Sequence, residues 1–239
     1  MIYPRIIAHR CGGALAPENT LSGLRIAARL GCRGVEFDAM LAADGVPILI
    51  HDETLERTTS GWGRVADMSS TQLAQFDAGS RFHPVFAGEP VPTLEEALRL
   101  CAALGLWANV EIKPSTGQEA ETGRAVARQA AAATGKLVLS SFSPAALRAA
   151  AGEAPQLPRA MLVEAIPVDW RQRMAEAGAL ALHSSACALT TAAREAVLAR
   201  GFPLACYTVN HREEGERLFA LGISAIFTDR PDLWAPSEM

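Results

Sequence analysis

The chain of 239 residues is 49% hydrophobic and 20% charged, a composition that can bury one large core and excludes global disorder. The formal net charge of −4 and the lack of a lysine and arginine block argue against a nucleic-acid or membrane partner. Five cysteines without a CxxC pair indicate neither a disulfide framework nor a thiolate zinc site. Because no signal peptide or apolar run of roughly 20 residues is found, we expect a cytoplasmic protein.

Short β-type runs alternate with alanine-rich segments of helical period along nearly the whole chain. The strand candidates are 5–10, 34–41, 46–52, 106–113, 136–142, 159–164, 179–185, 203–210 and 224–230. The helix candidates are 20–31, 93–105, 118–135, 143–152, 167–178, 191–201 and 211–222, and most of them end in glycine. This alternation predicts an α/β fold, a TIM-type (β/α)8 barrel formed by a single domain over residues 1–239.

The strand candidates number nine, one more than an eight-stranded barrel requires. Only the turn "AADG" separates 34–41 from 46–52, so no helix fits between them. Two interpretations remain open: the two runs form one long strand folded over the turn, or a barrel strand and an antiparallel partner.

Residues 53–92 interrupt the alternation, because they are rich in Gly, Ser, Pro and Asp and lack a long periodic helix. We expect a small insertion after the second barrel strand region, over the active-site face of the barrel. Trp62 and Phe82 could line the mouth of the site or pack inside the insertion, and we favour packing inside the insertion.

Acidic residues occur at alternate positions in two of the predicted strands. Since side chains alternate between the faces of a strand, Glu36 and Asp38 share one face, and Asn109, Glu111 and Lys113 share another. In a barrel both faces point inward, so we expect the three carboxylates to meet near the C-terminal ends of the strands.

Three converging, partly buried carboxylates repel one another unless a positive charge lies between them. A divalent cation with oxygen ligands, Mg²⁺ or Ca²⁺, would supply it. The alternative is an ordinary ion network in which Glu36 and Asp38 pair with Arg10, Arg33 or Lys113.

His9 and His51 each end an apolar run, so both are expected at the same barrel face as the carboxylates. Histidine suits proton transfer near neutral pH, with one imidazole taking a proton from the nucleophile and the other giving one to the leaving oxygen. His83, His183 and His211 lack acidic neighbours of this kind, and we assign them no catalytic role.

Several motifs, in order across essentially the whole chain, resemble those of the glycerophosphodiester phosphodiesterase family. They are "HRCGGALAPENT", "EFDAMLAADGVPILIHDETLERTT", "PTLEEAL", "VEIK", "YTVN" and "FTDRPD". The resemblance implies a TIM-type barrel with a small insertion and hydrolysis of glycerophosphodiesters to sn-glycerol 3-phosphate and an alcohol.

The resemblance also implies roles for residues at matching positions. These are His9 and His51 as the acid/base pair, Glu36, Asp38 and Glu111 as metal ligands, and Arg10 and Lys113 as phosphate-binding residues, with Glu18, Asn19 and Tyr207 in support. For Glu18 and Asn19, shaping the "PENT" turn is as good an interpretation as substrate contact.

This chain departs from the family pattern at two positions. Cys11 stands where the family usually has glycine, so its loop must accommodate a side chain. Tyr207 stands where the family usually has tryptophan, which keeps an aromatic wall but shortens its reach. Neither change removes a candidate ligand or proton-transfer group.

Other functions remain open on the same barrel. A phospholipase D-like hydrolase of lysophospholipids would share the metal and the histidines, and a non-catalytic barrel could bind phosphodiesters without cleaving them. A metal-dependent amidohydrolase is disfavoured, because the first strand reads His-Arg-Cys where such barrels carry His-x-His.

Overall fold

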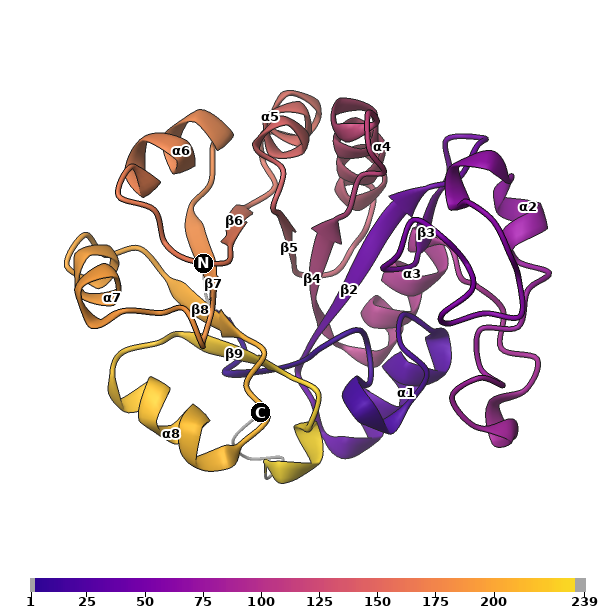
Figure 1. The fold of residues 1–239 in the computed structure, drawn as a ribbon, viewed down its shortest axis with the longest axis horizontal. Coiled ribbons are helices and arrows are strands. Elements are labelled where there is room, and N and C mark those ends of the chain that lie inside the picture. Colours follow the sequence, from indigo (N-terminus) through magenta and orange to yellow (C-terminus); the bar gives the residue numbers. More distant parts are fainter. Residues whose placement is uncertain (1–2, 235–239) are drawn as a thin grey trace.

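A closed ring of parallel strands surrounded by helices organises the computed structural model, which describes residues 3–234 (Figure 1). The ring runs in the order β1-β9-β8-β7-β6-β5-β4-β2 and is closed by pairing of β1 with β2. Its strands are β1 (Ile6–Ala8), β2 (Gly34–Leu41), β4 (Trp107–Ile112), β5 (Leu137–Ser141), β6 (Arg159–Val163), β7 (Ala181–Ser185), β8 (Leu204–Tyr207) and β9 (Ala225–Thr228). The TIM-type barrel expected from the sequence is confirmed.

The ninth strand, β3 (Pro47–Leu49), lies outside the ring and pairs antiparallel with the end of β2. Leu41 is paired with Pro47, and the turn between them places Gly45 at a φ of 77°, which glycine adopts without strain. The second interpretation of the surplus strand, a barrel strand with an antiparallel partner, is therefore correct.

Helices cover the outside of the ring. They are α1 (Leu21–Leu30), α3 (Leu94–Leu104), α4 (Glu119–Ala131), α5 (Pro144–Glu153), α6 (Trp170–Ala177), α7 (Thr191–Leu198) and α8 (Arg212–Ala220), with the one-turn α2 (Ser70–Leu73) outside the ring. Thr20 and Thr93 cap α1 and α3, and Gly31 and Gly105 end these two helices in the left-handed conformation. After β9 the described chain forms a short 3-10 helix, Pro231–Leu233, in a stretch where the sequence offers no helix candidate.

The barrel strands pack an apolar face against the helices, and a second apolar cluster fills part of the interior of the ring. Val35, Phe37 and Ala39 of β2 pack outward against the helices, as their alternation predicts. Inside the ring, towards the strand beginnings, His183 is fully buried and its Nε2 lies 2.9 Å from the Tyr3 hydroxyl. Burial lowers the pKa of His183 to about 3, so this imidazole is neutral.

The chain between β3 and α3, residues 50–93, forms a separate lobe beside the barrel, and we call it the β3–α3 segment (Figure 1). It contains α2 and a small core of its own that includes Leu55, Val65 and Leu73. Trp62 is 73% exposed, so the expectation that it packs in this core is wrong. Phe82 is 45% exposed and contacts Phe86 edge to face, with ring centroids 5.7 Å apart.

Within residues 3–234, no helix combines the length and the apolar character that crossing a membrane requires.

Candidate active site

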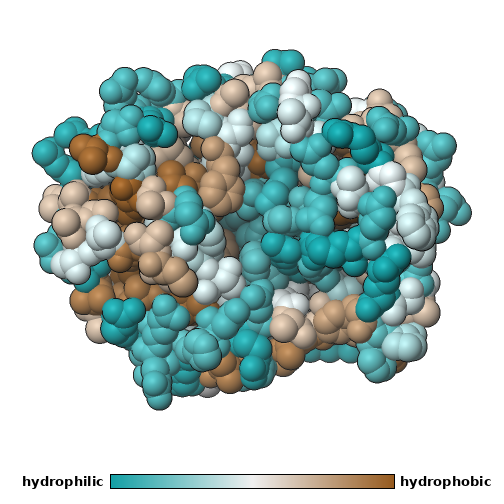
Figure 2. Space-filling model, in the orientation of Figure 1, coloured by the Kyte–Doolittle hydropathy of each residue, from teal (hydrophilic) through white to brown (hydrophobic). Residues whose placement is uncertain are grey.

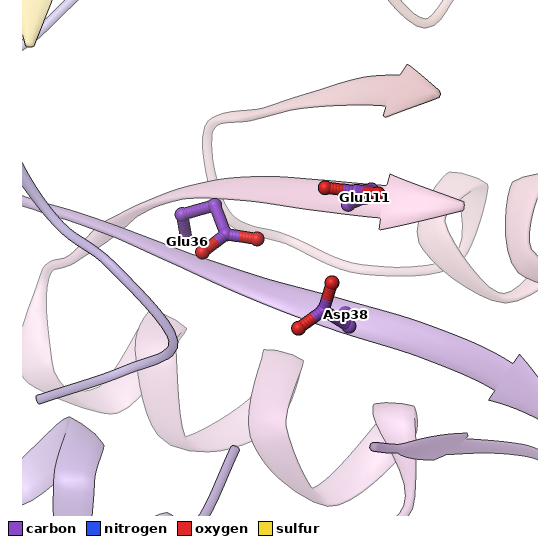
Figure 3. A group of neighbouring side chains, drawn as sticks. All are labelled: Glu36, Asp38 and Glu111. Carbon is purple, nitrogen blue, oxygen red and sulfur yellow. The ribbon is translucent and has the colours of Figure 1, made fainter. Parts of the chain in front are cut away.

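Three carboxylates from two adjacent strands converge inside the barrel. Glu36 and Asp38 project from β2 and Glu111 from β4, and their oxygens face one another (Figure 3). One oxygen of each lies within 4.8 Å of the other two. Register explains the meeting, because Asp38 is paired directly with Glu111 across the two parallel strands.

Burial and mutual repulsion shift the titration of these groups. Burial and then the charge of Asp38 raise the pKa of Glu36 to about 7 and that of Glu111 to about 8. Burial also opposes ionisation of Asp38, but the charges of Lys113, His51 and Arg10 outweigh it and lower its pKa. The cluster therefore holds excess negative charge once the protein is above neutral pH.

The cluster fits a hard divalent cation. Oε2 of Glu36 accepts a hydrogen bond from the backbone N–H of Arg10 at 2.8 Å, whereas its buried Oε1 accepts none within the described part of the chain. An orphaned carboxylate oxygen beside two further carboxylates is a donor set that suits Mg²⁺ or Ca²⁺.

Two cations border the carboxylates, so part of the ion network considered from the sequence is also present. Nζ of Lys113 lies 3.2 Å from Oε1 of Glu111 and 3.4 Å from Oδ1 of Asp38. Nε of Arg10 lies 3.9 Å from Oδ2 of Asp38. Between Arg33 and Glu36 or Asp38 no ion pair forms in residues 3–234.

His9 follows β1 and lies between two acidic groups. Its Nδ1 is 2.7 Å from Oδ1 of Asp229, and its Nε2 is 3.9 Å from Oε2 of Glu36. Asn210 fixes Asp229 by donating to its Oδ2 at 2.9 Å and accepting from its backbone N–H at 2.8 Å. Burial opposes the imidazolium, but the hydrogen bond to Asp229 and the nearby negative charges outweigh it and raise the pKa of His9.

His51 stands just after β3 and lines the same cavity as His9 and the carboxylates. Its Nδ1 is 2.6 Å from Oδ1 of Asp52, and its Nε2 is 2.7 Å from Nζ of Lys113. Burial lowers the pKa of His51, and the attraction of Asp38 and Asp52 does not fully offset this. Arg57 hydrogen-bonds Asp52 and so lowers the pKa of that carboxyl to about 2.

The turn that carries Glu18 and Asn19 supports the site from the side of α1. The Asn19 amide donates to Oδ2 of Asp38 at 2.8 Å and accepts from the Asp38 backbone N–H at 3.0 Å. Glu18 bridges Arg10, at 3.1 Å, and Arg57, at 2.7 Å. At the end of β8, the Tyr207 hydroxyl donates to the carbonyl oxygen of Val163 at 2.8 Å.

The sequence alone assigns no role to four residues of this arrangement, although they lie in the motifs quoted above. They are Asp52 of "IHDE", Arg57 of "ERTT", Asn210 of "YTVN" and Asp229 of "FTDRPD". Asp229 and Asp52 lie next to the candidate catalytic histidines. Asn210 and Arg57 donate hydrogen bonds to these two carboxylates.

Two cavities meet at this site. The inner cavity, of about 240 Å³, contains the three carboxylates, both histidines, Arg10 and Lys113, and Phe142, Tyr207 and Phe227 are among its walls. The outer cavity, of about 720 Å³, is lined by residues of the "PENT" turn, the β3–α3 segment and the loops after β8 and β9. Figure 2 shows a hollow near the middle of this face, bordered by hydrophilic side chains on the side towards β2 and α2.

Comparisons with known proteins agree with this geometry. Residues 9–233 match the model of the glycerophosphoryl diester phosphodiesterase family. A glycerophosphodiester phosphodiesterase of Caldanaerobacter subterraneus is 32% identical over 95% of this chain and 94% of its own length.

Solved structures resemble the chain over nearly all of its length. An Oleispira antarctica phosphodiesterase, solved with the product sn-glycerol-3-phosphate, is 34% identical with a TM-score of 0.93, covering 96% of this chain and 94% of its own. A putative glycerophosphoryl diester phosphodiesterase of Silicibacter pomeroyi is 26% identical with a TM-score of 0.83, covering 99% and 93%. This chain therefore belongs to the glycerophosphoryl diester phosphodiesterase family, a family of hydrolases.

Proposed function

We propose that the chain hydrolyses glycerophosphodiesters to sn-glycerol 3-phosphate and an alcohol in the inner cavity, with a divalent cation and two histidines. The observation that carries this proposal is that His9 and His51 line the same cavity as three buried carboxylates. The Oleispira antarctica relative, solved with sn-glycerol-3-phosphate, supports the choice of product.

Glu36, Asp38 and Glu111 would hold the cation, Mg²⁺ or Ca²⁺. When bound, such an ion neutralises negative charge on a phosphate oxygen in the transition state. Arg10 and Lys113 add fixed positive charge at the same place, and Asn19 keeps the Asp38 carboxylate in position. Glu18 orients Arg10, and Tyr207 forms part of the cavity wall.

The two histidines divide the proton transfers. His9 borders both cavities, so we assign it to protonate the oxygen of the leaving alcohol, which departs towards the outer cavity. His51 borders the inner cavity and would take the proton of the nucleophile. That nucleophile is water or the glycerol 2-hydroxyl, and phosphorus NMR distinguishes them, because only the second produces a cyclic phosphate.

We further propose that residues 1–239 form one cytoplasmic domain, with 53–92 as an insertion beside the outer cavity. Two observations support this: residues 57, 58, 78, 81 and 82 line that cavity, and all the cysteines are free thiols.

Release of glycerol 3-phosphate from glycerophosphocholine and glycerophosphoethanolamine tests the proposed reaction. We expect release with Mg²⁺ or Ca²⁺, loss of release with a chelator, and loss in a folded Glu36→Ala variant. If the metal-loaded wild type releases no glycerol 3-phosphate from either diester, the assignment is wrong. Unchanged diester despite measurable binding would instead favour a binding-only barrel, and cleavage of lysophosphatidylcholine alone a lysophospholipid hydrolase.

A further inference from the structure

The two cavities offer separate spaces for the two ends of a phosphodiester. His9, Arg10 and Thr208 line both cavities, so a phosphate held by Arg10 and the carboxylate-bound cation would lie where they meet. Resting on the function proposed above, the smaller inner cavity then takes the glycerol end, and the larger outer cavity takes the leaving alcohol. The walls of the outer cavity therefore determine which headgroups fit.

Guanidinium groups dominate the charged walls of the outer cavity. Arg10, Arg57, Arg81 and Arg230 line it, against the carboxylates of Glu18 and Asp229. Both carboxylates already form ion pairs with other residues of the site. Glu18 pairs with Arg57 and Arg10, and Asp229 pairs with His9.

Most of these guanidinium groups have a carboxylate partner, but Arg81 does not. Arg57 also pairs with Asp52, and Arg230 pairs with Asp232 at 2.8 Å. Arg81 donates through Nε to the carbonyl oxygen of Thr59, which anchors the side chain in the β3–α3 segment.

Within the described residues no carboxylate forms an ion pair with Arg81. A hydrogen bond from the backbone N–H of Gly63 lowers the pKa of Glu56, and the charge of Arg81 adds to this shift without an ion pair between the two side chains. The terminal nitrogens of Arg81 therefore remain available to an anion.

The outer cavity is poorly suited to a cationic headgroup. Quaternary ammonium groups are usually recognised by aromatic cages or by free carboxylates. Among the described lining residues, Phe82 supplies the single phenyl, phenol or indole ring, and neither carboxylate is free.

We propose that the outer cavity selects headgroups that carry a carboxylate, with Arg81 as the residue that recognises it. A carboxylate entering this cavity would gain a charge-assisted contact with the terminal nitrogens of Arg81. An amine without a carboxylate would gain no such contact and would meet the unpaired positive charge of Arg81.

Glycerophosphoserine and glycerophosphoethanolamine test the proposal, because their headgroups differ by one carboxylate. The readout is the ratio of the two kcat/KM values for glycerol 3-phosphate release, which does not depend on the active fraction of a preparation. We expect the wild type to prefer the serine diester by about tenfold, the effect of one charge-assisted contact. Arg81→Gln should bring the ratio close to one, and Arg81→Glu should make the ethanolamine diester the better substrate.

Arg64→Gln is the matched control, because Arg64 is an exposed arginine of the same segment that pairs with Glu53 at 2.8 Å and does not line the cavity. It should leave the wild-type ratio unchanged. Equal use of both diesters by the wild type, or an unchanged ratio in Arg81→Gln, would overturn the assignment of Arg81 while leaving the reaction intact. If neither diester released glycerol 3-phosphate, the proposed reaction itself would be wrong.

Discussion

The two candidate catalytic histidines differ in the charges around them. His9 is bonded to Asp229 and lies near Glu36, which raises its pKa despite burial. His51 has an Asp52 partner too, but burial and the cations Lys113 and Arg10 lower its pKa. Near neutral pH the imidazolium is favoured at His9 and the free base at His51, as their proposed roles as acid and base require.

Asp229→Asn tests whether Asp229 positions His9 and raises its pKa. The change removes the negative charge next to Nδ1, so we expect kcat/KM to fall about tenfold to a hundredfold, the range for loss of a charged hydrogen bond. It should also lower the pKa of His9, so the decline of activity at high pH should begin at a lower pH than in the wild type. Rates measured from pH 5 to 10 check both effects.

Asp232→Asn is the matched control for this variant. Asp232 lies three residues further on, in the 3-10 helix Pro231–Leu233, where its partner is Arg230 and it does not contact His9. Equal losses in the two variants, or an unmoved pH profile in Asp229→Asn, would show that Asp229 only stabilises the loop.

The alternation of side chains along a strand predicted that Glu36, Asp38 and Glu111 meet in the barrel, and they do. It gave no role to Asp229, because that residue is 220 positions from His9 and their contact depends on the closure of β9 against β1. Asp52 follows His51 directly, yet nothing in the pattern indicates that its side chain turns back to Nδ1. Local periodicity determines a side chain's face, whereas hydrogen-bond partners depend on tertiary structure.

At the level of elements, α1 approaches the loop after β1 very closely. A Cβ atom placed on Gly23 would lie 2.8 Å from Cβ of Cys11. Cys11 is fully buried at a φ of 77°, a conformation that costs most residues about 1 kcal/mol or more. The side chain that replaces the family's usual glycine is therefore accommodated against a glycine of the helix.

Gly23→Ala should destabilise the protein although alanine favours helices. The new methyl group would overlap Cys11, and such overpacking typically costs about 1–3 kcal/mol. Adding Cys11→Gly should recover part of that loss, because the added glycine removes the Cβ that clashes. Urea unfolding of the two single variants and the double variant measures the coupling, and strictly additive losses would contradict this packing.

Periodicity predicted most elements but not three features. Periodicity left the pairing of the strand candidate 46–52 open, and β3 in this stretch pairs antiparallel with β2. After β9 the described chain forms a 3-10 helix, Pro231–Leu233, for which the sequence offered no helix candidate. Trp62 lies exposed because the core of the β3–α3 segment is filled by other residues such as Leu55, Val65 and Leu73.

For the whole molecule, the carboxylate cluster links stability to pH and to metal. Glu36 has its ordinary pKa of 4.5 when unfolded and about 7 when folded, so the folded state binds its proton more tightly. This stabilising contribution is fully present below pH 4.5 and is lost as the pH rises through 7. Without metal, the protein should therefore lose stability towards alkaline pH, and a bound cation should restore it.

Glu36→Gln separates the two effects. At pH 8 without metal we expect the variant to be more stable than the wild type by about 1–3 kcal/mol, since it lacks the buried charge. The rise in melting temperature on adding Mg²⁺ or Ca²⁺ should be smaller than in the wild type. Glu121→Gln, at an exposed glutamate of α4, should show neither change. A variant that is less stable at pH 8 and still gains the full metal effect would contradict the assigned cation site.

The most direct measurement compares His9→Ala and His51→Ala on glycerophosphoethanolamine and on a p-nitrophenyl diester of glycerol phosphate, whose leaving group needs no protonation. We predict that both variants lose about 10²- to 10⁴-fold in kcat on the ethanolamine diester. On the p-nitrophenyl diester, His9→Ala should be close to the wild type, and His51→Ala should still be impaired. Wild-type rates for both variants on the ethanolamine diester would contradict the two-histidine mechanism at this site.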